Sequence, residues 1–409
     1  MKLTDEQKRM LEGEDGPIIG MAMNYLVKYG EAMGAEKLIP VENVHTVFTI
    51  PMESSGRGEE VVNLLKMFGQ LRVKATTTTH VGFMDFKKWR EFGIDERRYE
   101  LQASLVPVAA SAGIQLTWTC APEIVGNAPL KGQTCAWMES AAITYANGIL
   151  GARTNREGAE STMPAAVTGL IPCFGNHITE NRRGTILVDV EADLENLSDW
   201  GTLGYYGGDH AGLGVPVFRT RDIPTLEEAK ELCAALATEG GVGMFHIVGI
   251  TPEAPTVEAA FQGGMPKSRH TFTNKDKETV YKRLNICASP DVDIVMIGCP
   301  HATLTEIVEV AHLVEGKRIS PNTQLWVCTT HSIRSYAEKL GYDKMIADAG
   351  GKIMADTCPC ISQIEMARNK RYMTNSVKQA YYAPGQLGAQ VHFANTRDCI
   401  EAALKGKRG

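Results

Sequence analysis

Lys352-Ile-Met-Ala-Asp-Thr-Cys-Pro-Cys360 is the stretch from which the organisation of this chain can be worked out. The run 352–355 predicts a buried strand, and Cys358 follows where that strand should end, because Pro359 prevents its continuation. Two other stretches are built in the same way, namely Asp293-Ile-Val-Met-Ile-Gly-Cys299-Pro300 and Gly113-Ile-Gln-Leu-Thr-Trp-Thr-Cys120-Ala-Pro122. The sequence therefore predicts three strands that each deliver a cysteine at the carboxyl end.

The C-terminal third predicts alternating strands and helices. The expected strands are 292–298, 324–328 and 352–355, with helices over 303–314 and 332–340 between them. A βαβαβ order implies parallel strands joined by right-handed crossovers, so Cys299 and Cys358 must emerge at the same edge of one sheet. Ligands of open α/β sheets bind at this edge. We therefore expect a multi-domain α/β fold with parallel-rich sheets and a metal or iron–sulfur site at the strand carboxyl ends.

Composition limits the class of protein. The chain has 409 residues, 44% of them hydrophobic and 22% charged, as in ordinary soluble globular proteins of more than one domain. A net charge of -6 gives no general attraction to nucleic acid or to anionic membranes. The N-terminus lacks an apolar signal core, and no apolar run reaches the roughly 18 residues that a membrane span needs. We expect a cytoplasmic protein that contacts neither nucleic acid nor membrane.

The remaining cysteines have simpler interpretations. The chain contains ten, and a disulfide framework is not expected at this length. Cys328 also ends a predicted strand and is a weaker fourth candidate ligand. No CxxC pair is present, which disfavours a structural zinc ribbon. Those in helical or loop contexts are expected to be small buried hydrophobes: Cys173, Cys233, Cys287 and Cys399.

Elsewhere the patterns are less regular. Between 251 and 285 the composition becomes polar and proline-rich, which predicts an N-terminal α/β region over 1–265 and a C-terminal α/β domain over 266–409. We also expect a strand at 72–75, one long helix over 92–112, and a helix that begins near Thr134. His246 lies in a predicted buried strand and is expected to be a hydrogen-bonded core residue.

Two polar loops are candidate anion sites. The loop Pro51-Met-Glu-Ser54-Ser55-Gly-Arg-Gly58 follows a predicted strand and could present backbone N–H groups to an anion, or could be a plain turn. The loop Gly151–Gly158 holds Arg153, Asn155, Arg156 and Glu157. Its arginines could bind a carboxylate or phosphate bidentately, or the loop could be solvated and paired with itself.

Three thiolates indicate a particular kind of chemistry. They suit zinc or iron–sulfur centres, and a closed structural site would normally have four protein ligands. A site with three leaves a coordination position for substrate, where iron can act as a Lewis acid on a hydroxyl group. Hydroxide leaves poorly unless a metal polarises it, and a base must remove the proton from the adjacent carbon. The expected reaction is a dehydration.

Several motifs together resemble a known family. They are Thr119-Cys-Ala-Pro, Gly132-Gln-Thr-Cys-Ala-Trp-Met-Glu-Ser140, Tyr145-Ala-Asn-Gly-Ile-Leu-Gly-Ala-Arg-Thr-Asn-Arg-Glu-Gly158, Gly298-Cys-Pro-His, Asp356-Thr-Cys-Pro and Asn375-Ser-Val-Lys-Gln-Ala-Tyr-Tyr. Over nearly the whole chain the sequence resembles the large, catalytic subunit of the aconitase X family. This resemblance implies a hydro-lyase with mononuclear iron or a 2Fe-2S or 4Fe-4S cluster, held by Cys120, Cys299 and Cys358.

The resemblance also implies a set of substrate residues. Glu157, Ser376 and Lys378 are the expected catalytic residues, with Glu157 as a proton carrier whose pKa depends on burial. Lys378 and Arg153 are expected to contact a carboxylate or phosphate. Any of these side chains could instead orient its neighbours. The expected substrate-binding residues are Ser54, Ser55, Asn127, Glu139, Ser140, Arg153, Asn155 and Arg156.

Partner and substrate are likewise implied by the family. Its members need a small swivelling domain that contributes a serine, so we expect a separate small subunit. Known substrates are cis-3-hydroxy-L-proline in bacteria and mevalonate 5-phosphate in archaea, and the phrases Cys135-Ala-Trp-Met-Glu and Glu160-Ser-Thr favour the former. The chain departs from the family at 51–58, at Glu123 and at Cys360. Three alternatives stay open: a non-catalytic metal-binding homologue, a structural zinc protein, and an isomerase that rehydrates its product.

Overall fold

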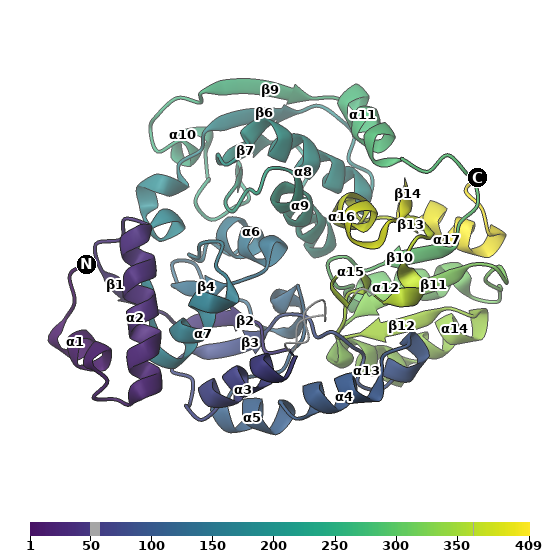
Figure 1. The fold of residues 1–409 in the computed structure, drawn as a ribbon. Helices are drawn as coiled ribbons and strands as arrows, with labels where there is room; N and C mark the ends of the chain where they lie inside the picture. The colour runs from purple at the N-terminus through teal and green to yellow at the C-terminus, as the bar shows by residue number, and fades with distance from the viewer. Residues whose placement is uncertain (50–57, 363) are drawn as a thin grey trace.

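The computed structural model describes residues 1–49, 58–362 and 364–409, and the candidate residues Ser54 and Ser55 lie outside these ranges. Three parallel sheets with their helices surround the middle of the molecule (Figure 1). The expected α/β fold with parallel-rich sheets is confirmed. Across the described ranges, no helix combines the length and hydrophobicity needed to cross a bilayer.

The first sheet has three parallel strands in the order β3 (Thr76–Thr79), β2 (Asn43–Thr46) and β4 (Cys135–Trp137). An antiparallel pair of β1 (Leu38–Pro40) and β5 (Leu170–Pro172) accompanies it. The helices of this N-terminal part are α1 (Asp5–Glu12), α2 (Pro17–Ala32), α3 (Gly58–Phe68), α4 (Glu96–Ala103), α5 (Val106–Ala112), α6 (Ser140–Gly148) and α7 (Ala159–Thr168).

The second sheet is four-stranded and parallel. Its order is β8 (His246–Ile247), β7 (Pro216–Arg219), β6 (Ile186–Val190) and β9 (Ser268–Phe272). Its helices are α8 (Leu197–Ala211), α9 (Leu226–Glu239), α10 (Val257–Ala260) and α11 (Asn274–Leu284). Although β9 follows residue 266 in the sequence, it pairs with β6 of this sheet. A division of the chain after residue 265 stays a prediction.

The third sheet contains five parallel strands, in the order β12 (Lys352–Ala355), β11 (Gln324–Thr329), β10 (Ile294–Ile297), β13 (Arg371–Thr374) and β14 (Gln390–Phe393). Its helices are α12 (Leu304–Val314), α13 (His331–Leu340), α14 (Tyr342–Ala349), α15 (Pro359–Ser362), α16 (Val377–Leu387) and α17 (Thr396–Lys405). The βαβαβ order expected for this part is present, so β10 and β12 end at the same edge.

Helix α9 lies between the second and third sheets in Figure 1 and packs against both α8 and α16. Glycines allow α8 and α9 to approach closely. A Cβ atom at Gly204 would lie 2.5 Å from the carbonyl oxygen of Leu232, a distance that real side chains do not tolerate. The close approach that the glycine-rich stretch 199–208 permits therefore occurs between two helices.

Four predicted elements are wrong, and three of them have a counterpart elsewhere or of another type. The strand expected at 72–75 lies instead at Thr76–Thr79, where the β-branched residues pair with β2 and the last three are buried. The helix expected over 92–112 is divided into α4 and α5, because Asp95 caps α4 and a proline occupies the first turn of α5. The helix expected from Thr134 is the strand β4, and α6 begins only at Ser140.

The strand expected to end at Cys120 is also absent from the described structure. Residues 113–120 run beside β3 with only isolated pairing. The backbone N–H groups of Gln115 and Thr119 donate to the carbonyl oxygens of Thr77 and Thr79 at 2.9 and 3.0 Å. These bonds carry the segment along the edge of the first sheet, so Cys120 still reaches the carboxyl end of β3.

Candidate active site

Each candidate cysteine ligand follows a backbone turn of rare conformation. Positive φ angles occur at Trp118 (39°), Gly298 (92°) and Asp356 (63°), one or two residues before Cys120, Cys299 and Cys358 respectively. Side chains make such angles unfavourable, and strained backbone concentrates at functional sites. In all three segments the chain turns sharply just before the thiol.

Gly298 is the turn with the clearest steric requirement. A Cβ atom there would lie 2.1 Å from the carbonyl oxygen of Cys328 at the neighbouring strand β11. Only glycine therefore allows the chain to leave β10 and turn into the segment that carries Cys299. Cys328 itself is fully buried in the core, and its pKa is raised mainly by that burial.

The three thiols are close enough to affect one another's ionisation. Burial raises the pKa of Cys299, and the neighbouring Cys358 and Cys120 raise it further. Burial and the Glu139 carboxylate raise the pKa of Cys120 to about 12. In contrast, hydrogen bonds from the Cys360 thiol and from backbone N–H groups lower the pKa of Cys358 to about 6. The group therefore contains one thiol that is readily ionised near neutral pH.

These thiols do not form a compact chelate by themselves. Within residues 1–49, 58–362 and 364–409, no group of three or more His, Cys, Asp and Glu side chains is arranged to hold a single metal ion. The donor chemistry nevertheless suits iron or an iron–sulfur cluster, since thiolates are the usual ligands of such centres.

A buried ion pair lies beside the thiols. The Lys378 ammonium donates to the Glu139 carboxylate and lies 3.5 Å from the Ser140 hydroxyl. The Nε2 atom of His80 lies 2.8 Å from the other oxygen of Glu139. Side-chain exposure is only 13% for Lys378, 9% for Glu139 and 8% for His80. The structure thus brings together Lys378, Glu139 and Ser140 from the expected set and adds His80.

Both charges of this pair are maintained despite burial. Burial alone would raise the pKa of Glu139, but Lys378 and His80 hold that pKa far below its usual value. Burial disfavours the ammonium of Lys378, but Glu139 and the thiols Cys299 and Cys120 raise its pKa above the usual value. Glu139 also has a φ angle of 151°, which is rare outside glycine. The pair is therefore a fixed, ionised couple at the amino end of α6.

Ser376 occupies the start of α16, two residues before Lys378. Its hydroxyl accepts a hydrogen bond from the backbone N–H of Gln379 at 3.3 Å and so caps the helix. Glu231 of α9 accepts from the backbone N–H of Val377 at 2.7 Å. Ser376 is thus placed beside the ion pair as an N-cap, and its expected catalytic role stays a prediction.

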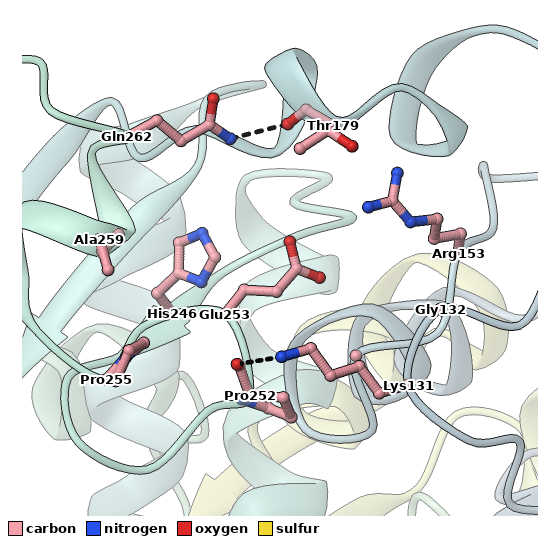
Figure 2. Close-up of a pocket in the computed structure, with 12 residues that line it drawn as sticks. Lys131, Gly132, Arg153, Thr179, His246, Pro252, Glu253, Pro255, Ala259 and Gln262 are labelled. Carbon is pink, nitrogen blue, oxygen red and sulfur yellow. Dashed lines mark hydrogen bonds between the residues drawn. The ribbon is translucent and has the colours of Figure 1, made fainter.

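The 151–158 loop lies against residues 174–177 and 241. The guanidinium of Arg153 donates to the carbonyl oxygen of His177 at 2.9 Å. Figure 2 shows this guanidinium turned into a pocket of about 400 Å³ that Lys131, Glu253 and His246 also line. Arg156 donates to the carbonyl oxygen of Gly241 at 2.9 Å. These contacts hold both arginines outside the Lys378 group.

Asn155 and Glu157 also make local contacts. The Asn155 side chain accepts from the backbone N–H of Asn176 at 2.8 Å. Glu157 is buried and accepts from the hydroxyls of Ser161 and Tyr29 at 2.6 and 3.1 Å, and burial raises its pKa. The expected role of Glu157 as a proton carrier stays a prediction.

Asn127 belongs to a buried polar network of the first sheet. Its amide accepts from Asn43 at 2.5 Å and donates to the Thr78 hydroxyl at 2.7 Å. The same hydroxyl lies 2.9 Å from Nδ1 of His45, whose Nε2 lies 3.0 Å from the carbonyl oxygen of Thr119. Asn127 is thus linked through Thr78 and His45 to the segment that carries Cys120.

His246 was expected to be a hydrogen-bonded core residue. Its Nε2 atom lies 2.8 Å from the carbonyl oxygen of Arg182, which agrees with that role.

Four residues close to the site were missed from the sequence: His80, Lys230, Glu231 and His301. His80 had a usable signal, because it ends the threonine run of β3 at the edge where ligands bind. His301 stands in the phrase Gly298-Cys-Pro-His, which could have drawn attention to it. The sequence gives no signal for Lys230 and Glu231, since their contacts with the third-sheet region depend on how α9 packs.

The fold and site define an α/β protein whose parallel sheets gather thiols and a buried ion pair at strand ends. Comparison with known proteins identifies the family. Residues 1–180, 184–282 and 292–405 match the first, second and third domains of aconitase X. The chain therefore belongs to the aconitase X family, as its motifs suggested.

Its relatives are named as dehydratases. The phosphomevalonate dehydratase large subunit of Methanothermobacter thermautotrophicus is 35% identical over 96% of each chain. The protein of that name from Methanocaldococcus jannaschii is 34% identical over the full length of both. The cis-3-hydroxy-L-proline dehydratase of Pseudomonas aeruginosa is 32% identical over 97% of this chain but only 69% of its own length.

The crystal structure of aconitase X from Thermococcus kodakaraensis in its holo-form superposes with a TM-score of 0.84. It is 32% identical and covers 98% of this chain and 100% of its own. Together these findings confirm the expected family and support the hydro-lyase class. Sequence identity does not separate the two named substrates, since both groups of relatives lie between 29 and 35%.

Proposed function

We propose that this chain is the large subunit of an iron-dependent dehydratase that removes water from cis-3-hydroxy-L-proline. The observation that carries the proposal is the ionised Lys378–Glu139 pair beside the three thiols. A cyclic amino acid bears one carboxylate and one ring ammonium. Lys378 supplies a cation for the carboxylate, and Glu139 supplies an anion for the ammonium, so the buried pair matches both charges of such a substrate.

The same pair is less suited to a phosphorylated hydroxy acid. Mevalonate 5-phosphate carries a carboxylate and a phosphate and has no cationic group. In a buried site, the Glu139 carboxylate would repel either anion, because like charges interact strongly where water is excluded. Arg153, a candidate phosphate contact, is directed into the separate pocket of Figure 2. The local electrostatics therefore favour the amino acid.

In this proposal Cys120, Cys299 and Cys358 hold the iron or iron–sulfur centre. When bound, that centre supplies a Lewis acid for the departing hydroxyl group. Thiolates are the usual protein ligands of both iron–sulfur clusters and soft metal ions, so the three cysteines suit either kind of centre. Lys378 orients the substrate carboxylate, while Glu139, which accepts from His80, orients the ring nitrogen.

A small subunit completes the proposed enzyme. Two relatives that this chain matches from end to end are named large subunits, whereas the hydroxyproline dehydratase of P. aeruginosa is a longer single chain. We propose that a separate small subunit provides the part that corresponds to the extra length, including the serine implied by the family. The reduced thiols that the site needs suit the cytoplasm.

The subunit organisation favours the alternative, mevalonate 5-phosphate, since the relatives of matching length carry that name. The test is to co-express the chain with its small subunit without oxygen and to follow water loss from each compound. We expect turnover of cis-3-hydroxy-L-proline and little of mevalonate 5-phosphate. The reverse preference would overturn the substrate assignment. Zinc in place of iron in the purified complex, with no turnover, would indicate a structural metal protein.

A further inference from the structure

His301 makes contacts with the segments of all three candidate ligands. It lies two residues after Cys299 and is 1% exposed. Its backbone N–H donates to the sulfur of Cys120 at 3.3 Å. Its ring atom Nδ1 lies 3.2 Å from the Thr119 hydroxyl, and Nε2 lies 3.0 Å from the carbonyl oxygen of Thr357. Thr119 precedes Cys120 and Thr357 precedes Cys358, so one side chain joins the three segments.

The hydrogen bonds of His301 define its tautomer. The carbonyl oxygen of Thr357 can only accept, so Nε2 must carry the ring proton. The Nδ1 atom then carries the lone pair and accepts from the Thr119 hydroxyl. The same hydroxyl oxygen accepts from the backbone N–H of Ala121 at 3.1 Å. Both ring nitrogens are thus occupied by protein, and neither has a lone pair available for a metal.

Lys230 of α9 binds the backbone of the same segment. Its ammonium donates to the carbonyl oxygens of His301 and Pro300 at 2.7 and 3.3 Å and to the carboxylate of Glu306 at 2.6 Å. Lys230 is 2% exposed, so three acceptors match its three protons. Because α9 belongs to the second sheet, these bonds fix the Cys299 segment relative to a different part of the molecule.

We propose that His301, held in place by Lys230, is a positioning residue that sets the spacing of the three thiols and does not itself bind the metal. The inference rests on the proposed function for its assignment of the thiols as metal ligands. Metal ligands on three separate segments must be held in position by neighbouring groups before the metal binds. Within the described residues, His301 bonds directly to both of the segments that approach its own.

The test measures how firmly iron is held. The complex with the small subunit is reconstituted with iron and sulfide without oxygen, and loss of iron to an excess of a chelator is followed in the visible spectrum. Three variants remove one contact each: His301→Phe, Thr119→Val and Lys230→Met. We expect each to lose iron at least about ten times faster than the wild type. His301→Gln keeps an N–H that can donate to the Thr357 carbonyl oxygen, so it should lose iron more slowly than His301→Phe.

Glu227→Gln is the matched control. Glu227 lies on the same helix as Lys230 and accepts from the Thr303 hydroxyl at 2.8 Å, but it does not contact the Cys299 segment carbonyls at Pro300 and His301. Its rate of iron loss should stay at the wild-type value. Circular dichroism and thermal unfolding are recorded for every variant to check that it folds. If His301→Phe does not fold, the rates of iron loss from Thr119→Val and Lys230→Met decide the result.

Two results would overturn the inference. One is wild-type iron retention in both Thr119→Val and Lys230→Met. The other is an altered absorption spectrum in His301→Gln while those two variants behave normally, which would identify His301 as a ligand. Failure of the proposed function is distinguishable, because the wild-type complex itself would then take up no iron.

Discussion

Lys378 and Glu139 are 239 residues apart in the sequence and form a buried ion pair beside three thiols. Glu139 follows β4 of the first sheet, and Lys378 lies in the first turn of α16, which connects β13 and β14 of the third sheet. The pair therefore joins two separate parts of the molecule at the point where their strands end. Breaking such a pair leaves one buried charge without a partner, which is more costly than the loss of an exposed contact.

The first prediction concerns the charge of Glu139. Glu139→Gln keeps the shape of the side chain but removes the anion proposed to contact the ring nitrogen of the substrate. We expect kcat/KM for cis-3-hydroxy-L-proline to fall about 10- to 100-fold, as for loss of a charged hydrogen bond of ~1.5–3 kcal/mol. Steady-state kinetics measure this. Glu160→Gln, at an exposed position, is the control, and equal activity of both variants would argue against the proposed contact.

The second prediction concerns pH. Burial raises the pKa of Glu231 to about 8, so the folded protein keeps a proton that the unfolded chain releases. Between the unfolded value of about 4.3 and the folded value, the unfolded state binds fewer protons, so this group lowers stability as pH rises. Glu231→Gln cannot ionise and can still accept from Val377. Urea unfolding at about pH 5 and about pH 8 should therefore show a smaller loss of stability in the variant. Identical losses in both proteins would contradict this.

The third prediction concerns helix packing. Gly204→Ala places a methyl group against the Leu232 carbonyl oxygen and should destabilise the protein by about 1–3 kcal/mol through overpacking. Gly385 of α16 is the matched control, because a Cβ atom there meets nothing within 4 Å. Gly385→Ala should be neutral or should stabilise by up to about 1 kcal/mol. Denaturant unfolding compares them, and similar effects at both positions would show that α8 and α9 do not need the glycine.

The sequence predicted β10, β11 and β12 of the third sheet, because strands and helices alternate regularly there, but it did not predict β13 and β14. It was less informative for the first sheet. Thr76–Thr79 is polar in composition yet forms a buried parallel strand, since its hydroxyls and backbone are satisfied by neighbours such as Thr117 and Ala75. The segment before Cys120 is apolar enough to predict a strand, but its backbone pairs with β3 only at intervals.

In the candidate site, too, residues marked by local patterns were predicted and residues placed by tertiary packing were not. Motifs pointed to Cys120, Cys299, Cys358 and Lys378, because strand ends and family phrases are local features. Partners that depend on distant packing could not be found in this way. The hydrogen bond from Lys230 to the carbonyl oxygen of His301 depends on how α9 packs against the third sheet, and no local motif around Lys230 indicates it.

The most direct test of the central claim is the iron content of single cysteine variants purified without oxygen as complexes with the small subunit. Cys120→Ser, Cys299→Ser and Cys358→Ser should each lose most of the iron and the visible absorption. Cys173→Ser, a partly exposed thiol outside the group, should keep both. Full iron and colour in any of the first three, with a folded complex, would contradict the proposal that these thiols hold the metal centre.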